Sequence, residues 1–201
     1  MKSPFFFGYG SLVNRATHDY FSAQSARAHG WRRGWRRSPD RALAFLTAIA
    51  SPGDYIDGLI AGVPGGDWQA LDQRERAYQR LDATDQIDHA HDASLDIAIY
   101  AIDPNAHFEP DGDTPVLLSY IDVVIQGYLQ EFGRQGVAHF FDTTSGWHVP
   151  VIDDRAAPIY PRHQTLSQDE RALVDETLAE KGARRVALGD VPSAWFDGLE
   201  T

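Results

Sequence analysis

The chain has 201 residues, of which 43% are apolar and 11% are aromatic. A chain of this length and composition can bury one sizeable core, so we expect a single globular domain over residues 1–201 and exclude intrinsic disorder. Eighteen Lys and Arg against 29 Asp and Glu leave a net charge of −11, which argues against nucleic acids and anionic membranes as partners.

The cysteine content and the N-terminus narrow the class of protein further. The sequence contains no Cys, which excludes disulfides, thiolate catalysis and Cys-ligated zinc or iron–sulfur sites. The apolar run Phe5-Phe6-Phe7 is too short for a signal peptide, and no stretch is long enough to span a bilayer. We therefore expect a soluble, cytoplasmic protein, whose oligomeric state the sequence leaves open.

Apolar runs in the first half of the chain predict strands. They cover residues 5–9, 26–37, 42–50, 55–63 and 95–102. The turns between the three middle runs contain Pro or Gly, which favours an antiparallel meander. Residues 82–94, rich in Asp and His, are expected to be partly loop, and residues 142–164, with three prolines, to wrap over the surface in extended form.

Caps and apolar spacing predict four helices. The first two cover residues 14–21, capped by Asn14, and residues 68–80, capped by Asp67, with inward positions at Trp68, Leu71, Ala77 and Leu81. The third follows Pro115 and covers residues 116–132, because Gly133 ends the apolar periodicity. The fourth begins with the capping box Ser167-Gln168-Asp169-Glu170 and runs to about Lys181.

The first candidate site is the turn Gly8-Tyr9-Gly10-Ser11-Leu12. It follows a predicted strand and precedes a predicted helix, a place where free backbone N–H groups converge and can bind a carboxylate or an oxyanion. The alternative is a tight turn that merely needs two glycines. The turn lacks the third glycine of a dinucleotide fold, and Ser11 is not in the Gly-x-Ser-x-Gly pattern of an α/β hydrolase.

The second candidate site is Glu75, in the predicted helix over residues 68–80. By itself, a helical Glu between Arg74 and Arg76 reads as a solvated ion pair. Tyr78, one turn further, reads as an amphipathic residue at the edge of a helix. The order and spacing of several motifs change both interpretations.

Four motifs occur in an order and spacing that resemble the gamma-glutamylcyclotransferase superfamily. They are Phe7-Gly8-Tyr9-Gly10-Ser11-Leu12, Gly30-Trp31-Arg32, Ile56-Asp57-Gly58-Leu59-Ile60 and Leu71-Asp72-x-x-Glu75-x-x-Tyr78-x-Arg80. The resemblance covers about residues 5–102, and two ordered motifs far apart are more specific than either alone. Beyond residue 115, only Ser119-Tyr120 and the helix that ends at Phe132-Gly133 resemble the glutathione-degrading branch.

The resemblance implies an α+β fold, a small mixed β-barrel that is closed or nearly closed and flanked by helices. The core barrel would cover about residues 4–102, and a helical C-terminal extension about residues 115–201. It also implies a cyclotransferase, an acyltransferase or lyase that releases 5-oxoproline from a small γ-glutamyl metabolite and needs no cofactor or metal. The family's acidic residue maps onto Glu75, and its substrate-binding residues map onto Tyr9, Gly10, Ser11, Leu12 and Tyr78, with Tyr120 as an additional candidate and Arg80 as a structural residue.

The chemistry of this reaction suits those residue types. The α-amine of a γ-glutamyl compound is an ammonium near neutral pH, so a base must remove a proton before it can attack the γ-carbonyl. Glu75 would be that base, and burial in a barrel mouth would raise its pKa toward the working range. The turn's N–H groups would hold the substrate carboxylate or stabilise the oxyanion.

Other interpretations remain open at the level of sequence. The same fold can serve as a non-catalytic domain that binds a small carboxylate or another protein. His89-x-His91, with Asp88 and Asp92, is a weaker hypothesis for a metal site. The repeat Trp31-Arg32-Arg33-Gly34-Trp35 could stack on bases, although a strand with Trp inward and Arg outward explains it too. The leaving group of the substrate cannot be read from the sequence.

Overall fold

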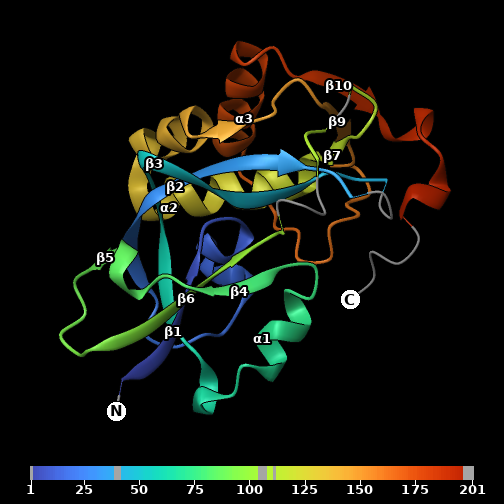
Figure 1. Ribbon diagram of the computed structural model, residues 1–201. Helices are drawn as coiled ribbons and strands as arrows, with labels where there is room; N and C mark the ends of the chain where they lie inside the picture. Colours follow the sequence, from blue (N-terminus) through green and yellow to red (C-terminus); the bar gives the residue numbers. More distant parts are fainter. Residues whose placement is uncertain (1, 39–41, 104–107, 111, 197–201) are drawn as a thin grey trace.

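The computed structural model describes residues 2–38, 42–103, 108–110 and 112–196 (Figure 1). Its α-helices are α1 (Gln69–Arg74), α2 (Leu118–Asp142) and α3 (Gln168–Glu180). Its strands are β1 (Ser3–Gly8), β2 (Gln24–Arg36), β3 (Phe45–Gly62), β4 (Gln79–Asp82), β5 (Ile87–His89), β6 (Leu95–Ala101), β7 (Val116–Leu117), β8 (Thr144–Ser145), β9 (Pro150–Asp153) and β10 (Arg184–Ala187). None of the helices in these ranges is both long and apolar enough to cross a bilayer.

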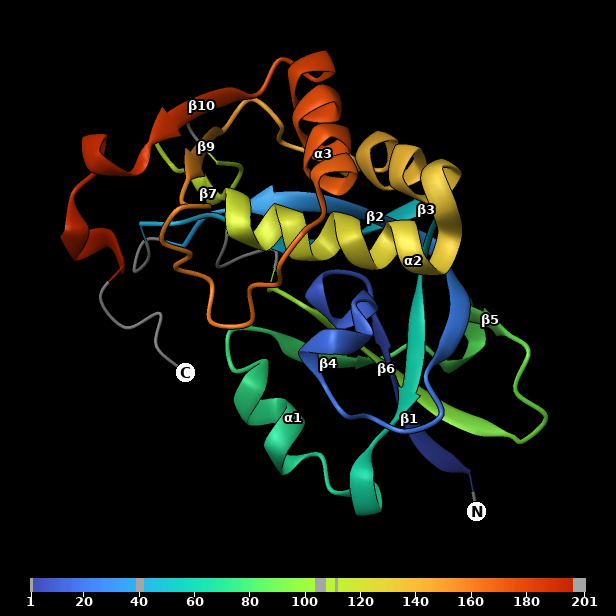
Figure 2. The same cartoon turned by 180° about the vertical axis from the view of Figure 1, so that it is seen from behind.

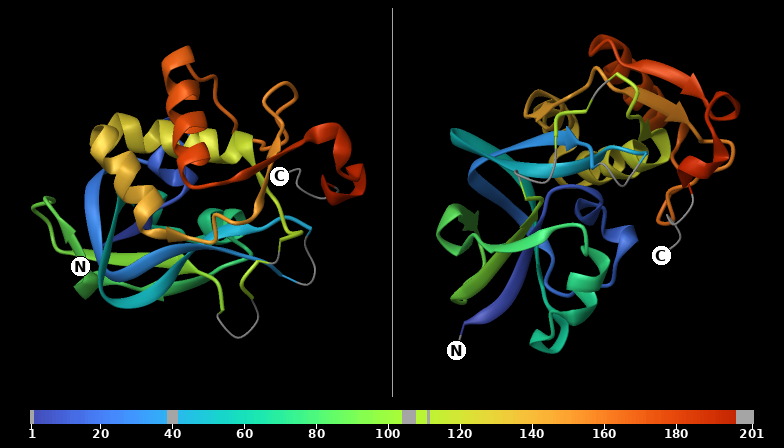
Figure 3. Two further views of the ribbon diagram at one scale, coloured as in Figure 1. Left: turned by 90° about the horizontal axis from the view of Figure 1, so that it is seen from above. Right: turned by 45° about the vertical axis from the view of Figure 1, so that its right-hand side comes forward.

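The larger sheet has the strand order β4-β6-β1-β3-β2-β5, and β8 also pairs with β2. The central strand β1 is parallel to β6 and antiparallel to β3, as expected for a mixed sheet. The sheet is strongly curled (Figure 3), and its end strands, β4 and β5, do not pair with each other in the described part of the chain. The molecule is therefore an α+β protein built on an open, curled half-barrel.

The long strand β3 replaces the two strands predicted over residues 42–50 and 55–63. It pairs with β2 in two registered stretches, 45–50 with 31–36 and 55–60 with 24–29, and the register shifts between His29 and Trp31. Residues 51–54 lie between these stretches and have no registered partner on β2. Pro52, which lacks a backbone N–H, therefore interrupts no hydrogen bond between the two strands. The Pro-Gly pair therefore bends a continuous hairpin instead of ending a strand.

Two of the predicted helices are wrong in extent. Residues 14–21 contain no α-helix but a 3₁₀ turn, Arg15–Thr17, which follows another at Ser11–Val13. Helix α1 ends at Arg74 rather than residue 80, because Gln79–Asp82 pairs with β6 as strand β4. Leu81, predicted to face inward, is consequently 37% exposed, whereas Leu71 is buried.

Helix α2 lies across the β2–β3 hairpin and supplies much of the core (Figure 2). The helix is broken at Gly133, whose φ of 64° is accessible to glycine and costly for other residues, and a second helical stretch then continues to Asp142. The predicted end at Gly133 is therefore a kink. Tyr128, Phe140 and Phe141 are buried in the core, as their spacing predicts.

The Trp-Arg repeat lies on β2 and differs from the prediction at one position. Trp31 and Trp35 are buried, as expected, but Arg33 is also fully buried. Residues two apart on a strand share a face, so Arg33 points the same way as the two tryptophans. Within the described chain its guanidinium bonds to hydroxyl and carbonyl oxygens, and this repeat is part of the core.

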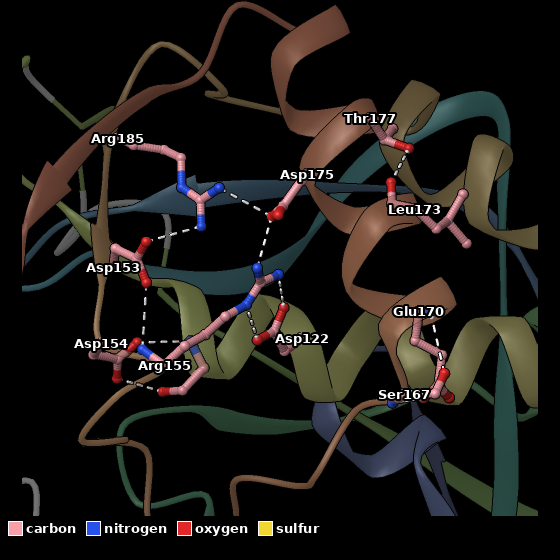
Figure 4. A network of polar contacts seen from close by, with 11 residues as sticks. Asp122, Asp153, Asp154, Arg155, Ser167, Glu170, Leu173, Asp175, Thr177 and Arg185 are labelled. Atoms are coloured by element: carbon pink, nitrogen blue, oxygen red, sulfur yellow. Dashed lines mark hydrogen bonds and ion pairs between the residues drawn. The ribbon is translucent and has the colours of Figure 1, made fainter.

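The C-terminal part contains a sheet in addition to its helices. Strands β10, β9 and β7 form a parallel sheet that the sequence analysis did not predict. Helix α3 begins with the predicted capping box, in which Ser167 and Glu170 bond to each other's backbone N–H. Arg155 bonds to Asp122 of α2 and Asp175 of α3, which joins the two helices (Figure 4).

Candidate active site

The glycine-containing turn follows β1 and leads into the 3₁₀ turn Ser11–Val13. At Gly10 the backbone approaches α2 closely, because a Cβ atom there would lie 2.6 Å from the Tyr120 hydroxyl. The buried side chain of Asn14 donates to the Val123 carbonyl and to Gln126 of the same helix. The glycine-containing turn therefore packs between the larger sheet and the N-terminal part of α2.

A pocket of about 40 Å³ opens beside this turn. It gathers residues from β1, β3, β6, the end of α1 and the start of α2. Its lining is Phe7, Gly8, Tyr9, Gly10, Ser11, Leu12, Leu46, Glu75, Tyr78, Tyr100 and Tyr120. Every site residue expected from the sequence therefore lines one pocket, including Tyr120 from the second half of the chain.

Glu75 reaches the pocket from the C-terminal end of α1. The helix ends one residue earlier, so Glu75 is its C-cap and is not on a solvated helix face. Its side chain is only 18% exposed, and its carboxylate lies 3.3 Å from the Arg74 guanidinium. Burial raises the pKa of Glu75, while the charges of Arg74 and Arg162 oppose that shift.

Tyrosine hydroxyls line the pocket around Glu75. Tyr78 donates to the Leu46 carbonyl at 2.8 Å, and Tyr9 donates to the Tyr100 carbonyl at 2.5 Å. Burial raises the pKa of Tyr9 and of Tyr120 above the usual value for a phenol. These phenols therefore stay protonated at neutral pH and offer neutral hydrogen-bonding groups to a ligand.

Residues that the sequence analysis did not select also surround the site. Leu46 and Tyr100 are part of its lining, and the Tyr160 hydroxyl donates to the Ser11 hydroxyl at 2.8 Å. Arg74 precedes Glu75 in the sequence and forms the ion pair with it that the sequence predicts. Tyr160 and Arg162 belong to the segment predicted to wrap over the surface, where no local pattern marks a residue that contacts a turn 149 positions earlier.

The other candidate groups lie elsewhere. His89 and His91 stand 6.5 Å apart between ring centroids, and the His91 ring packs on Phe5 at 5.2 Å. No cluster of three or more His, Asp or Glu side chains suited to a metal ion occurs among the residues that the structure describes. Arg80 pairs with Asp72 and lies over the Trp68 ring, in agreement with its expected structural role.

Comparison with solved structures places this arrangement among known folds. A protein described as gamma-glutamyl cyclotransferase superposes with a TM-score of 0.55 and 14% identity, over 87% of this chain and 99% of that one. An uncharacterized human protein gives a TM-score of 0.56 at 14% identity with the same coverage. YkqA from Bacillus subtilis gives 0.54 at 12% identity, over 73% of this chain and 57% of its own.

No protein-family model matches the sequence, and no curated protein matches it. The likeness to solved structures extends well beyond the N-terminal half that carries the sequence resemblance, because it covers 87% of the chain. At 14% identity that likeness defines the fold and not the activity. The chain has the gamma-glutamylcyclotransferase-like fold.

Proposed function

We propose that the protein releases 5-oxoproline from a γ-glutamyl compound by intramolecular attack of the α-amine, with Glu75 as general acid and base. One observation carries the proposal: a largely buried carboxylate, Glu75, and a glycine-containing turn that includes Gly10, 65 residues earlier in the sequence, line the same pocket. The fold shared with a protein described as gamma-glutamyl cyclotransferase supports it.

Glu75 is suited to the proton transfers of this reaction. Its carboxylate would take a proton from the substrate's α-ammonium, whose nitrogen then forms a bond to the γ-carbonyl carbon. Collapse of the tetrahedral intermediate breaks the bond to the leaving nitrogen. Two protons move in total from the α-nitrogen to the leaving amine, and Glu75 would carry them one at a time. The raised pKa of Glu75 brings its acid and base forms closer to balance near neutral pH.

The rest of the pocket would orient the substrate. The backbone N–H groups of the turn at Gly10 and Ser11 are suited to the α-carboxylate or to the oxyanion that forms on the γ-carbonyl oxygen. The tyrosine ring of Tyr120 closes the pocket against the turn. Since nucleophile and electrophile belong to one molecule, holding the substrate in a bent conformer supplies much of the rate gain.

The test is an assay for 5-oxoproline release from glutathione, γ-glutamylalanine and γ-glutamylethylamide, with the parent protein and Glu75→Gln. The substitution keeps the side chain's shape and removes the base, so we expect a loss of at least about a hundredfold in kcat/KM. Glu176→Gln, on an exposed face of α3, is the matched control and should keep full activity. Equal activity of the parent and Glu75→Gln would remove Glu75 from the mechanism, and no release from any compound would reject the activity.

A further inference from the structure

Two arginines flank Glu75 in the sequence, and one of them is buried together with its carboxylate. The Arg74 Nε atom lies 3.3 Å from the Glu75 carboxylate, and the two side chains are 11% and 18% exposed. Arg76, at the same distance along the chain on the other side, is exposed. The structure therefore distinguishes two arginines that the sequence pattern treats alike.

The end of helix α1 explains why Arg74 can face its neighbour. Side chains of consecutive residues on a helix point about 100° apart and do not meet. The helix ends at Arg74, and Glu75 has a φ of −100° and a ψ of 28°, outside the helical region. Because the backbone departs from the helix at Glu75, its carboxylate can lie beside the preceding guanidinium and still line the pocket.

Arg74 also contacts the segment that follows the glycine-containing turn. Its Nη1 atom donates to the Thr17 carbonyl at 3.4 Å. The Thr17 hydroxyl in turn lies 3.0 Å from the Ser11 carbonyl and 2.9 Å from the Asn14 carbonyl. Arg74 therefore links the carboxylate of Glu75 to the backbone of the glycine-containing turn, the other half of the site.

Stability alone explains this buried arginine poorly. The Arg74 Nη2 atom is buried and has no hydrogen-bond partner among the residues that the structure describes. Removing an ion pair from water commonly costs as much as the attraction returns, and an unsatisfied buried donor adds to the cost. The nearby pair between Arg80 and Asp72 is more exposed and avoids this cost. An effect of the guanidinium on Glu75 is the better explanation.

Ionisable groups that face the Glu75 carboxylate come from several parts of the chain. They are Arg74, Arg162 and the pocket tyrosines Tyr9, Tyr78, Tyr100 and Tyr120. A phenol is neutral near neutral pH, so the charges from these groups are positive. Burial raises the pKa of Glu75, and Arg74 is the largest influence that opposes this shift. Burial and the charge of Arg74 lower the pKa of His18, which adds no charge at neutral pH.

We infer that Arg74 is a positioning residue of the site: its guanidinium orients the Glu75 carboxylate and favours its ionised form, so that Glu75 can accept a proton from the substrate's ammonium. This inference rests on the proposed function. Arg74 does not itself line the pocket, so it acts through Glu75 and not on the ligand. A nearby cation favours the charged form of a carboxyl group, in opposition to burial.

The same pair would assist the return of the proton. When Glu75 is protonated, its attraction to Arg74 is lost, which makes the neutral carboxyl a stronger acid toward the leaving nitrogen. Each proton that Glu75 takes from the α-nitrogen is released to the leaving amine, so Glu75 ends as the carboxylate with which the reaction began. Arg74 stays protonated throughout.

The pH dependence of kcat/KM tests this inference. The substrate is the compound that the parent converts fastest among glutathione, γ-glutamylalanine and γ-glutamylethylamide. The rise of kcat/KM at the acidic end of the profile reports the pKa of the essential base in the free enzyme. In Arg74→Gln we expect this rise to move to higher pH, and the plateau above it to fall by about tenfold because the carboxylate loses its orientation. A rise at the same pH as in the parent would overturn the inference.

Three further variants sharpen the comparison. Arg74→Lys keeps a charge beside Glu75 but loses the planar fork, so it should return the rise toward the pH of the parent. Arg76→Gln makes the same change in charge at the exposed neighbour and should change neither the rise nor the plateau. An equal shift in Arg76→Gln would show that net charge, and not the contact, sets the ionisation. If Arg74→Gln does not fold, Arg74→Met replaces the buried side chain by an apolar one, and the same shift is expected.

A titration without substrate separates this inference from the proposed activity. Carboxyl ¹³C NMR follows the ionisation of Glu75 directly, and its signal is identified by its absence in Glu75→Gln. A higher pKa of Glu75 in Arg74→Gln than in the parent would support the role of Arg74 even if the parent released no 5-oxoproline. The same pKa in both proteins would reject that role whether or not the parent is active.

Discussion

The guanidinium of Arg33 donates a hydrogen bond to the carbonyl oxygen of Tyr9 at 3.2 Å, from directly behind the glycine-containing turn. The Tyr128 hydroxyl lies 3.0 Å from the same carbonyl and 2.7 Å from that of Asp57. A trans peptide places its C=O and N–H on opposite sides, so a Tyr9 carbonyl that faces the core leaves the Gly10 N–H directed away from it. Arg33 and Tyr128 are therefore expected to orient the turn without touching a ligand.

Tyr128→Phe should destabilise the protein by about 1–3 kcal/mol, because buried partners then lose a hydrogen bond. The Tyr128 hydroxyl also accepts from Arg33 at 2.5 Å, so the guanidinium would lose one of its few acceptors. Urea unfolding monitored by tryptophan fluorescence measures the change. Tyr20→Phe is the control, since Tyr20 is half-buried and its hydroxyl has no hydrogen-bond partner in the described chain; a similar loss there would contradict this reasoning.

Gly10→Ala should destabilise the protein by about 1–3 kcal/mol through overpacking, because the new Cβ would lie 2.6 Å from the Tyr120 hydroxyl. Tyr120→Phe removes that oxygen and leaves the ring carbon Cζ at 3.9 Å, an ordinary contact. A double-mutant cycle of the two changes should therefore show favourable coupling. Gly189→Ala, where a Cβ meets no atom within 4 Å, should be nearly neutral. Additivity of Gly10→Ala and Tyr120→Phe would show that the contact does not restrict the turn.

The stability of Glu75→Gln relative to the parent should depend on pH. Burial raises the folded-state pKa of Glu75 above its usual 4.5, so the folded protein holds this proton more tightly than the unfolded chain. The associated stability is present below the unfolded pKa and is lost as pH rises through the folded pKa. Gln does not titrate, so the stability of the variant relative to the parent should rise as pH rises from about 4 to about 8. Urea unfolding across this range checks the sign, which a pH-independent difference would contradict.

Asp154→Asn should loosen the segment that carries Tyr160 and Arg162. The substitution replaces one acceptor oxygen by an NH₂ group that would face N–H and O–H donors from Ser119 and Ile159. We expect a cost of about 1–3 kcal/mol and faster amide hydrogen exchange over residues 155–166. The neighbouring Asp153→Asn is the control, because Asp153 makes a partly exposed ion pair with Arg185 and such pairs contribute little. Unchanged exchange in Asp154→Asn would show that other contacts hold the segment.

Sequence signals that act over a few residues predicted local structure well. The capping box of α3 needs only Ser167 and Glu170, three positions apart, and both of its hydrogen bonds are present. The break at Gly133 is equally local, although the chain resumes a helix after it. Local patterns gave the wrong secondary structure where a contact with a distant segment decides it. The pattern of residues 79–82 continues the helix predicted before them, but these residues pair with the edge of β6 and form strand β4.

The sequence by itself determined the fold, through ordered motifs whose resemblance extends over about half the chain, and it selected residues that the structure gathers around one pocket. Only the tertiary structure decided that Arg33 is a buried support of the turn and that the Tyr160 hydroxyl bonds to Ser11 of the same turn. The physical reason is that these roles depend on contacts between segments far apart in the chain. Helix and strand propensity and apolar periodicity depend only on residues that are close in the sequence. The burial of a charged side chain and a contact between distant segments depend on partners that folding brings together.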